Sequence, residues 1–240
     1  MSESINPEKL VNDAFSTDWE VSQLAIADII DTCEEDEKYI PQMASLAEKH
    51  LSGEVKEKIL ACELLGRINA KVSLSKIQDC LKDSNEDVRE IAAKALGWLG
   101  DPSSVDSLIS ILSDPDDEVR EVSCRALGEI GDKKAVDPLI YATRDEDIEV
   151  RLEAGIALGK LCDGKAIEPL IELLGDIDLG VIKGASESLV LFGEKALPNL
   201  EKIVEHPKLE TLKDRRLGKQ KKYASRLIMA IKAGKKYIDV

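Results

Sequence analysis

Apolar residues along the chain recur every three or four positions, and the whole arrangement repeats every 31 residues. In the stretch that starts at Val119, apolar or small residues stand at positions 119, 122, 123, 126, 127 and 130. This spacing places them on one side of an α-helix, so it predicts an amphipathic helix. Matching stretches start at Glu57, Val88, Val150 and Val181, which gives five units in one register.

A second and shorter apolar stripe follows each long one. After Asp132, apolar residues stand at positions 135, 136, 139 and 140, and similar segments start at Ser103 and Lys165. The pair Gly131-Asp132 supplies a C-terminal cap for the longer helix and an N-cap for the next one. The segment Asp114-Pro115-Asp116 predicts the turn inside the hairpin. Each unit is therefore expected to be a helical hairpin.

A single hairpin of this size cannot bury its apolar stripe, so neighbouring hairpins must stack. The sequence predicts an all-α fold of the alpha-alpha superhelix type, with about seven helical hairpins between Asn6 and Ala233. We expect residues 1–207 to form the solenoid and residues 208–240 to form a basic C-terminal capping helix of the same domain. The irregular hairpins at both ends are expected to turn a polar face to water.

The most complete unit reads V-R-x-x-A-A-x-A-L-G-x-x-G-D, with Val88, Arg89, Ala92, Ala93, Ala95, Leu96, Gly97, Gly100 and Asp101. This pattern resembles the HEAT-like repeats of the phycobilisome-lyase type, over residues 20–205. The resemblance implies stacked helical hairpins. For function it implies several classes: protein-binding scaffolds, bilin-lyase subunits, deoxyhypusine hydroxylase and, more distantly, alkylpurine DNA glycosylases.

Two columns of residues share the repeat period and predict structural roles. Basic residues stand at the second position of the longer helices, and aspartates stand five residues before the first position, which predicts ion pairs between repeats. Small residues form the second column, and a glycine follows four positions later, which predicts close approach of neighbouring helices. The first column holds Lys58, Arg89, Arg120 and Arg151 with Asp83, Asp114, Asp145 and Asp176; the second holds Cys62, Ala93, Cys124, Gly155 and Ser186.

The composition adds no signal for catalysis. The two histidines, His50 and His206, are far apart, the His-Glu pairs of deoxyhypusine hydroxylase are missing, and no glycine-rich phosphate loop occurs. The five cysteines include no Cys-x-x-Cys pair and are expected to be reduced residues buried in helices. The sequence thus predicts no catalytic, cofactor or metal residues and favours a protein that is not an enzyme. Without a leader or membrane-spanning stretch, it also predicts a cytoplasmic protein.

Positions on the longer helices that avoid both the core stripe and the small column should line the inner face of the solenoid. Most of them are charged, including Lys94 and Arg125, but four carry large apolar side chains, which favours a partner-binding surface. These four are Trp98, Leu152, Ile156 and Leu191. The alternative for the helix from Val150 is a rotation that buries Leu152 and Ile156 and frees Glu153.

The charge is distributed unevenly along the chain. The formal net charge is −14, yet residues 208–240 carry 11 Lys or Arg against 3 acidic residues. An amphipathic pattern there predicts a closing helix with an outer basic face, including Lys213, Arg215, Arg216, Lys219, Lys221, Lys222 and Arg226. The face could hold an acidic partner or RNA; alternatively, it is a solvated cap that relieves the repulsion within an acidic body.

The architecture favours a non-catalytic scaffold or adaptor that binds another protein through the inner face. One alternative is a bilin-lyase-like or other modification-enzyme subunit that is active only with a partner. Another is nucleic-acid binding through Arg215, Arg216, Lys221 and Lys222, although the overall acidic charge disfavours nucleic acid. The glycosylase class is disfavoured because the acidic residues Glu90, Glu121 and Glu129 surround the position of Trp98. The sequence leaves the oligomeric state open.

Overall fold

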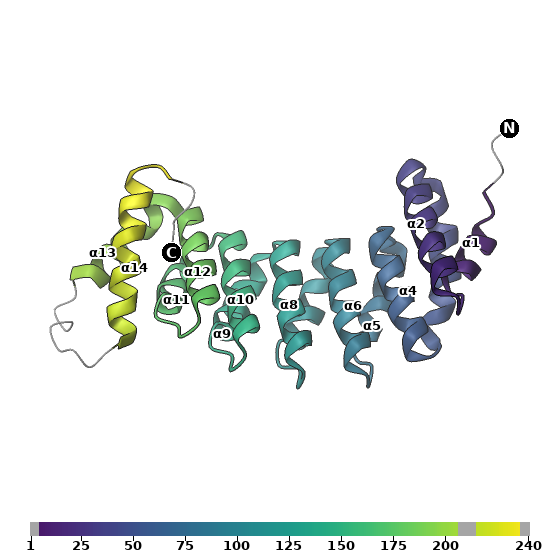
Figure 1. Ribbon diagram of the computed structural model, residues 1–240, viewed down its shortest axis with the longest axis horizontal. Helices are drawn as coiled ribbons and strands as arrows, with labels where there is room; N and C mark the ends of the chain where they lie inside the picture. Colours follow the sequence, from purple (N-terminus) through teal and green to yellow (C-terminus); the bar gives the residue numbers. More distant parts are fainter. Residues whose placement is uncertain (1–4, 206–214, 236–240) are drawn as a thin grey trace. The chain divides into compact units, whose positions relative to one another are not determined.

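The chain folds into a succession of α-helices connected by tight turns and short 3-10 helices (Figure 1). The computed structural model describes residues 5–205 and 215–235, and no β-strand occurs within these ranges. The helices follow one another in pairs, as predicted from the two apolar stripes. Residue contacts divide the chain into two units, Met1–Ile111 and Leu112–Val240.

In the first unit, α1 packs on α2 and α3, α4 packs on α6, and α5 packs on α6. The longer helices α4 and α6 lie side by side in Figure 1, and the shorter α5 connects them along the chain. The elements of this unit are α1 (Pro7–Ala14), α2 (Trp19–Glu35), η1 (Glu37–Tyr39), α3 (Ile40–Ala47), η2 (Glu48–Ser52), α4 (Val55–Arg67), η3 (Lys71–Ser73), α5 (Leu74–Cys80), α6 (Glu86–Leu99), η4 (Pro102–Ser104) and α7 (Val105–Ser110).

In the second unit, α10 lies between α8 and α12, and α14 packs on α11, α12 and α13 (Figure 1). The elements of this unit are α8 (Asp117–Ile130), η5 (Lys133–Ala135), α9 (Val136–Ala142), α10 (Ile148–Leu161), η6 (Gly164–Ala166), α11 (Ile167–Leu173), α12 (Leu179–Phe192), η7 (Gly193–Ala196), α13 (Leu197–Glu205) and α14 (Arg215–Lys232).

The helix ends follow the capping chemistry predicted from the sequence. The side chain of Asp116 accepts a hydrogen bond from the backbone N–H of Val119 and begins α8. At the other end of α8, Gly131 has a φ of 80°, which only glycine adopts without strain. The next residue, Asp132, then caps η5 through the N–H of Lys134. The Gly-Asp pair therefore ends one helix and begins the next, as predicted.

The glycines four positions after the column of small residues bring neighbouring longer helices into close contact, which confirms the prediction. A Cβ atom added at Gly128 in α8 would lie 2.9 Å from the Cα of Ala157 in α10. A Cβ atom at Gly159 in α10 would lie 3.0 Å from the Cα of Ser188 in α12. In the first unit, the same substitution at Gly66 would meet the backbone of Ala95 at 2.9 Å. No larger residue fits at these glycines without separating the helices.

The predicted ion pairs between repeats are confirmed where the structure describes them. Arg120 donates from Nε and Nη2 to the two carboxylate oxygens of Asp145, at 2.9 and 2.8 Å. Arg151 makes the same bidentate contact with Asp176, and Lys58 Nζ lies 2.7 Å from Asp83 Oδ2. Because the guanidinium of Arg120 also donates to the backbone carbonyl of Asp114, it fixes the turn inside its own hairpin.

The cysteines are buried in helices with one exception. Cys62 and Cys124 have no exposed surface and occupy packing positions, as predicted. Cys162 is exposed, so its expected burial in a helix is wrong. It stands directly after α10 with a φ of 49°, at the position that Gly131 occupies after α8. The 31-residue period identifies this position as a C-terminal cap, where burial is not required.

The two terminal hairpins depart from the sequence predictions in different ways. Leu24 and Trp19 of α2 are 68% and 73% exposed, so the N-terminal cap does not turn a purely polar face to water. At the other end, Lys219 of α14 donates a hydrogen bond to the backbone carbonyl of Asp176, at 2.9 Å. Its expected place on the outer face is therefore wrong. The part of the predicted closing helix at 208–214, with Lys213, lies outside the described residues.

Candidate functional site

Trp98 and Lys94 lie together on α6, in the first unit. The ring of Trp98 covers Gly66 of α4, because a Cβ atom at Gly66 would lie 2.8 Å from Cε3 of the ring. Lys94 Nζ lies 5.5 Å from the ring centroid, within the range of a cation–π contact. Trp98 is still 39% exposed. The indole is thus held in place on one side and accessible on another, which suits an anchor for a partner.

Leu152 and Ile156 lie on α10, in the second unit, and both are half-buried. A Cβ atom at Gly184 of α12 would lie 2.6 Å from Leu152 Cδ1 and 3.5 Å from Ile156 Cγ1, so both side chains pack over this glycine. Glu153 is not freed, because Arg125 Nη2 donates to its carboxylate at 3.0 Å. The rotation considered as an alternative would bury Leu152 and Ile156 and free Glu153. The structure partly buries the two aliphatic residues, but it keeps Glu153 paired.

Arg125 is the centre of a charged cluster between α8 and α10. It pairs with Glu121 on its own helix and with Glu153 on the next. Burial raises the pKa of Glu121, and the neighbouring carboxylates of Glu153 and Glu149 add to this effect against the opposing contribution of Arg125. Because Arg125 is already shared by two carboxylates, its predicted contribution to a partner would require displacement of one of them.

Leu191 lies on α12 and is 63% exposed. Lys183 and Glu187, which share its side of the helix, form an exposed ion pair at 3.9 Å. The exposed positions predicted on the longer helices are therefore accessible in both units, and Leu191 is the most exposed of the four apolar candidates. Whether these residues bind a partner stays a prediction.

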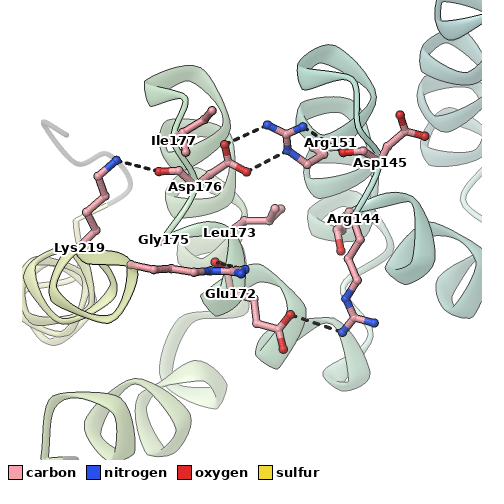
Figure 2. Close-up of a pocket in the computed structure, with 11 residues that line it drawn as sticks. Arg144, Asp145, Arg151, Glu172, Leu173, Gly175, Asp176, Ile177 and Lys219 are labelled. Carbon is pink, nitrogen blue, oxygen red and sulfur yellow. Dashed lines mark hydrogen bonds and ion pairs between the residues drawn. The ribbon is translucent and has the colours of Figure 1, made fainter. Parts of the chain in front are cut away.

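Figure 2 shows a groove in the second unit that the sequence did not predict. Its volume is about 800 Å³, and it lies between the turns that precede α10 and α12 and the start of α14. Arg144 Nη2 and Glu172 Oε2 are 3.4 Å apart at its edge, while the exposed Ile177 adds apolar surface. The 31-residue period could not reveal this groove, because α14 contributes Arg216 and Lys219 from outside the repeats.

The basic residues predicted on the C-terminal helix have different environments. Arg216 and Gln220 donate to the carbonyl of Glu172 at the end of α11, and Lys219 donates to the carbonyl of Asp176 in the turn that follows. Cations stabilise the C-terminal end of a helix, so these contacts anchor α14. Lys222 is exposed and lies 5.2 Å from the ring of Tyr223, whereas Lys221 is half-buried. Arg215 begins α14, and its side chain lies outside the described residues.

His50 has a structural environment that the sequence did not indicate. Its ring stacks on Phe15 with centroids 3.6 Å apart, and its Nδ1 lies 3.8 Å from Glu57 Oε2. His206 lies outside the described residues. Within residues 5–205 and 215–235, no group of three or more His, Cys, Asp or Glu side chains could hold a metal ion. In the same ranges, no helix combines the length and the apolar character needed to cross a membrane.

The family model of HEAT repeats matches residues 40–122, 105–190 and 141–215. Together these matches cover more than half of the chain, so the protein belongs to the HEAT-repeat family, as the resemblance of the repeat indicated. The fold is the predicted all-α superhelix of helical hairpins. No protein with a curated description is significantly similar to the chain in sequence.

Several solved structures share this fold. A chain of the CpcE–CpcF complex of phycocyanin lyase from Nostoc sp. PCC7120 is 19% identical, with a TM-score of 0.57 and 95% of each chain covered. An archaeal HEAT-like repeat protein from Thermococcus onnurineus NA1 is 18% identical, with a TM-score of 0.55 and coverage of 94% and 99%. Kap95p, in its complex with RanGDP, is 14% identical with a TM-score of 0.66, over 95% of this chain and 37% of Kap95p.

Proposed function

We propose that the protein is a non-catalytic scaffold that binds another protein through the inner face formed by its longer helices. The observation that carries this proposal is the environment of Trp98, a large aromatic side chain that is fixed against Gly66 and still 39% exposed. Tryptophan is enriched among the residues that dominate binding energy at protein interfaces. A fixed ring loses little conformational entropy when a partner covers it.

The second unit offers a further contact surface with the same character. Leu191 is exposed, and the outer parts of Leu152 and Ile156 remain accessible beside the charged cluster of Arg125. An apolar centre with a charged rim is the usual organisation of a protein interface. Two similar structures are of proteins in complexes, CpcE with CpcF and Kap95p with RanGDP, which supports a partner-binding role for this chain.

The proposal is tested by purifying tagged protein from its native host and quantifying the proteins that accompany it. Trp98→Ala is expected to reduce the amount of one specific partner by about tenfold or more, the usual effect at a dominant interface residue. Tyr141→Ala is the matched control, because Tyr141 is 78% exposed but lies on the shorter helix α9. Equal recovery of every partner with both folded variants would contradict the proposal.

The second surface is tested in the same experiment with the Leu152→Glu/Ile156→Glu variant. A charge at either position would oppose burial against an apolar partner surface. Because both residues also pack over Gly184, circular dichroism and a thermal melt must first establish that this variant is folded. A folded variant that retains the partner lost by Trp98→Ala would restrict the binding surface to the first unit.

The purification also distinguishes the two alternative functions. A lyase or modification-enzyme subunit would accompany a coloured or cofactor-carrying complex. Nucleic-acid binding through the basic helix would depend steeply on salt and would be lost on replacing Arg215, Arg216, Lys221 and Lys222 with Gln. Loss of a protein partner in the Trp98 variant, with no effect of the Gln variant, would favour the scaffold over both alternatives.

A further inference from the structure

The outward face of α2 is acidic and carries one exposed leucine in its middle. The helix contains five acidic residues and no lysine or arginine. Its buried face consists of Ser22, Ala25, Ile26, Ile29 and Cys33. Glu20, Leu24, Asp28 and Asp31 follow one another at spacings of three and four, and all are exposed. This spacing places them in one row on the side of the helix that faces away from the core.

The outward face of α14 has the same organisation with the opposite charge. The helix contains seven lysine or arginine residues and no acidic residue. Its buried residues Tyr223, Ala224, Leu227 and Ile231 face the second unit. Lys222, Arg226, Met229 and Lys232 are exposed and form a row, in which Met229 is 65% exposed. A single large apolar side chain thus lies among cations on α14, as Leu24 lies among acids on α2.

The two rows match in one orientation. When the helices are antiparallel and Leu24 is opposite Met229, Asp28 is opposite Arg226 and Asp31 is opposite Lys222. At the other end of the row, Glu20 is opposite Lys232, which also pairs with Glu201 at the surface. In a parallel arrangement, Asp31 would lie beyond Lys232, the last residue of α14. Antiparallel packing therefore gives three opposite-charge pairs around one apolar contact, whereas parallel packing gives only two.

We propose that α14 of one copy of the chain binds α2 of a second copy in this antiparallel register. Charge complementarity identifies the occupant, because each face finds its opposite row on the same chain with matching positions. The contact is heterologous: each copy uses its C-terminal helix toward one neighbour and its N-terminal helix toward another. A single pair of helices buries less than the roughly 800 Å² per partner of a standard stable interface, so the association is weak and concentration-dependent.

Charge exchange tests the register. In sedimentation velocity over a concentration series at low salt, Lys222→Asp and Asp31→Lys should each raise the dissociation constant about tenfold or more. The double variant Asp31→Lys/Lys222→Asp should restore association, because the pair between copies reforms with reversed charges. Lys82→Asp is the control for Lys222→Asp: it makes the same change in net charge at a side chain that is 83% exposed, and it should have no effect.

Two results of this series would overturn the proposal. One is a parent protein that remains monomeric at every concentration at low salt. The other is an association that Lys222→Asp abolishes while Asp31→Lys leaves it intact, which would mean that α14 binds an acidic surface other than α2. The series uses purified protein alone, so its outcome is independent of the partner proposed for the face with Trp98.

Disulfide formation between separate chains tests the apolar contact directly. Cys162 is exposed and is first replaced by Ser, whereas the other four cysteines are buried. A chain with Leu24→Cys, mixed with a chain with Met229→Cys, should form a disulfide between chains under mild oxidation, detected by mass spectrometry. Leu24→Cys mixed with Lys82→Cys is the control and should form no disulfide between chains. Equal yields in the two mixtures would contradict the register.

Discussion

The carboxylate of Asp145 shows how one residue connects two repeats. Burial alone would raise its pKa, but hydrogen bonds from the guanidinium of Arg120 and the backbone N–H of Asp147 outweigh burial and lower the pKa. Arg120 is itself only 8% exposed, so each group neutralises a charge that would otherwise be buried. The pair of Arg120 and Asp145 thus connects two repeats and also holds Arg120 where it fixes the turn of its own hairpin.

A pH dependence of stability follows from this pair. Since the folded protein lowers the pKa of Asp145 below its unfolded value of about 3.9, the carboxylate stabilises the fold above about pH 4 and loses this effect as pH falls further. Asp145→Asn should lower the free energy of unfolding at neutral pH by about 2–3 kcal/mol, because Arg120 loses its counter-charge. Urea unfolding should show this difference shrinking below about pH 4.

Asp137→Asn provides the comparison for that experiment. Asp137 is 71% exposed and pairs with Lys165 at the surface, so its loss should change the free energy of unfolding by less than about 0.5 kcal/mol. If the Asp145→Asn difference were as small, or did not vary with pH, the buried pair would not have the stabilising role assigned to it.

At the scale of helices, the spacing between α8 and α10 depends on Gly128, which has no side chain. Gly128→Ala would place a Cβ atom 2.8 Å from the Cβ of Ala157 and 2.9 Å from its Cα. Because a backbone atom is involved, the helices must separate, and the free energy of unfolding should fall by about 1–3 kcal/mol. Gly218→Ala on α14 meets no atom within 4 Å and should stabilise by about 0.5–1 kcal/mol.

Chemical denaturation of the two glycine variants measures both effects. Opposite signs are the expected outcome, because alanine favours a helix wherever space allows it. If Gly128→Ala lost no stability, contact with Ala157 would not set the spacing of α8 and α10; if Gly218→Ala lost stability, the helix-propensity argument would be wrong.

The 31-residue period made the helices predictable, and its limits explain what was missed. Every repeat imposes the same burial on equivalent positions, so the sequence indicated the glycine column, the caps and the ion pair of Arg120. Cys162 occupies the position equivalent to Gly131, 31 residues later. We expected it to be buried because cysteines usually are, but the structure places it in an exposed C-terminal cap. Lys219 lies outside the period, and its contact with the carbonyl of Asp176 depends on how α14 packs.

The candidate binding site was predictable only as a set of equivalent positions. Periodicity indicated that Trp98, Leu152, Ile156 and Leu191 avoid the core stripe. It could not indicate that Trp98 packs on Gly66, or that Leu152 and Ile156 pack on Gly184, because both contacts depend on the spacing between helices. The exposed Leu24 was missed because α2 lies outside the regular repeats, where no equivalent position constrains the interpretation.

At the scale of the whole molecule, stacking gives each helix contacts mainly with its neighbours, so stability should be transmitted locally. Leu158 in α10 is fully buried, and α10 packs on both α8 and α12. Leu158→Ala should lower the free energy of unfolding by about 3 kcal/mol. Hydrogen exchange measured by mass spectrometry should show the largest loss of protection in α8, α10 and α12.

Helix α14 provides the internal reference for this experiment, because its main contacts are with α11, α12 and α13. Leu227→Ala, at a fully buried position of α14, should reverse the pattern and reduce protection chiefly in α13 and α14. Local transmission requires these two profiles to differ. If both variants lowered protection equally throughout the second unit, that unit would unfold as a single cooperative body, and the nearest-neighbour description of its stability would be wrong.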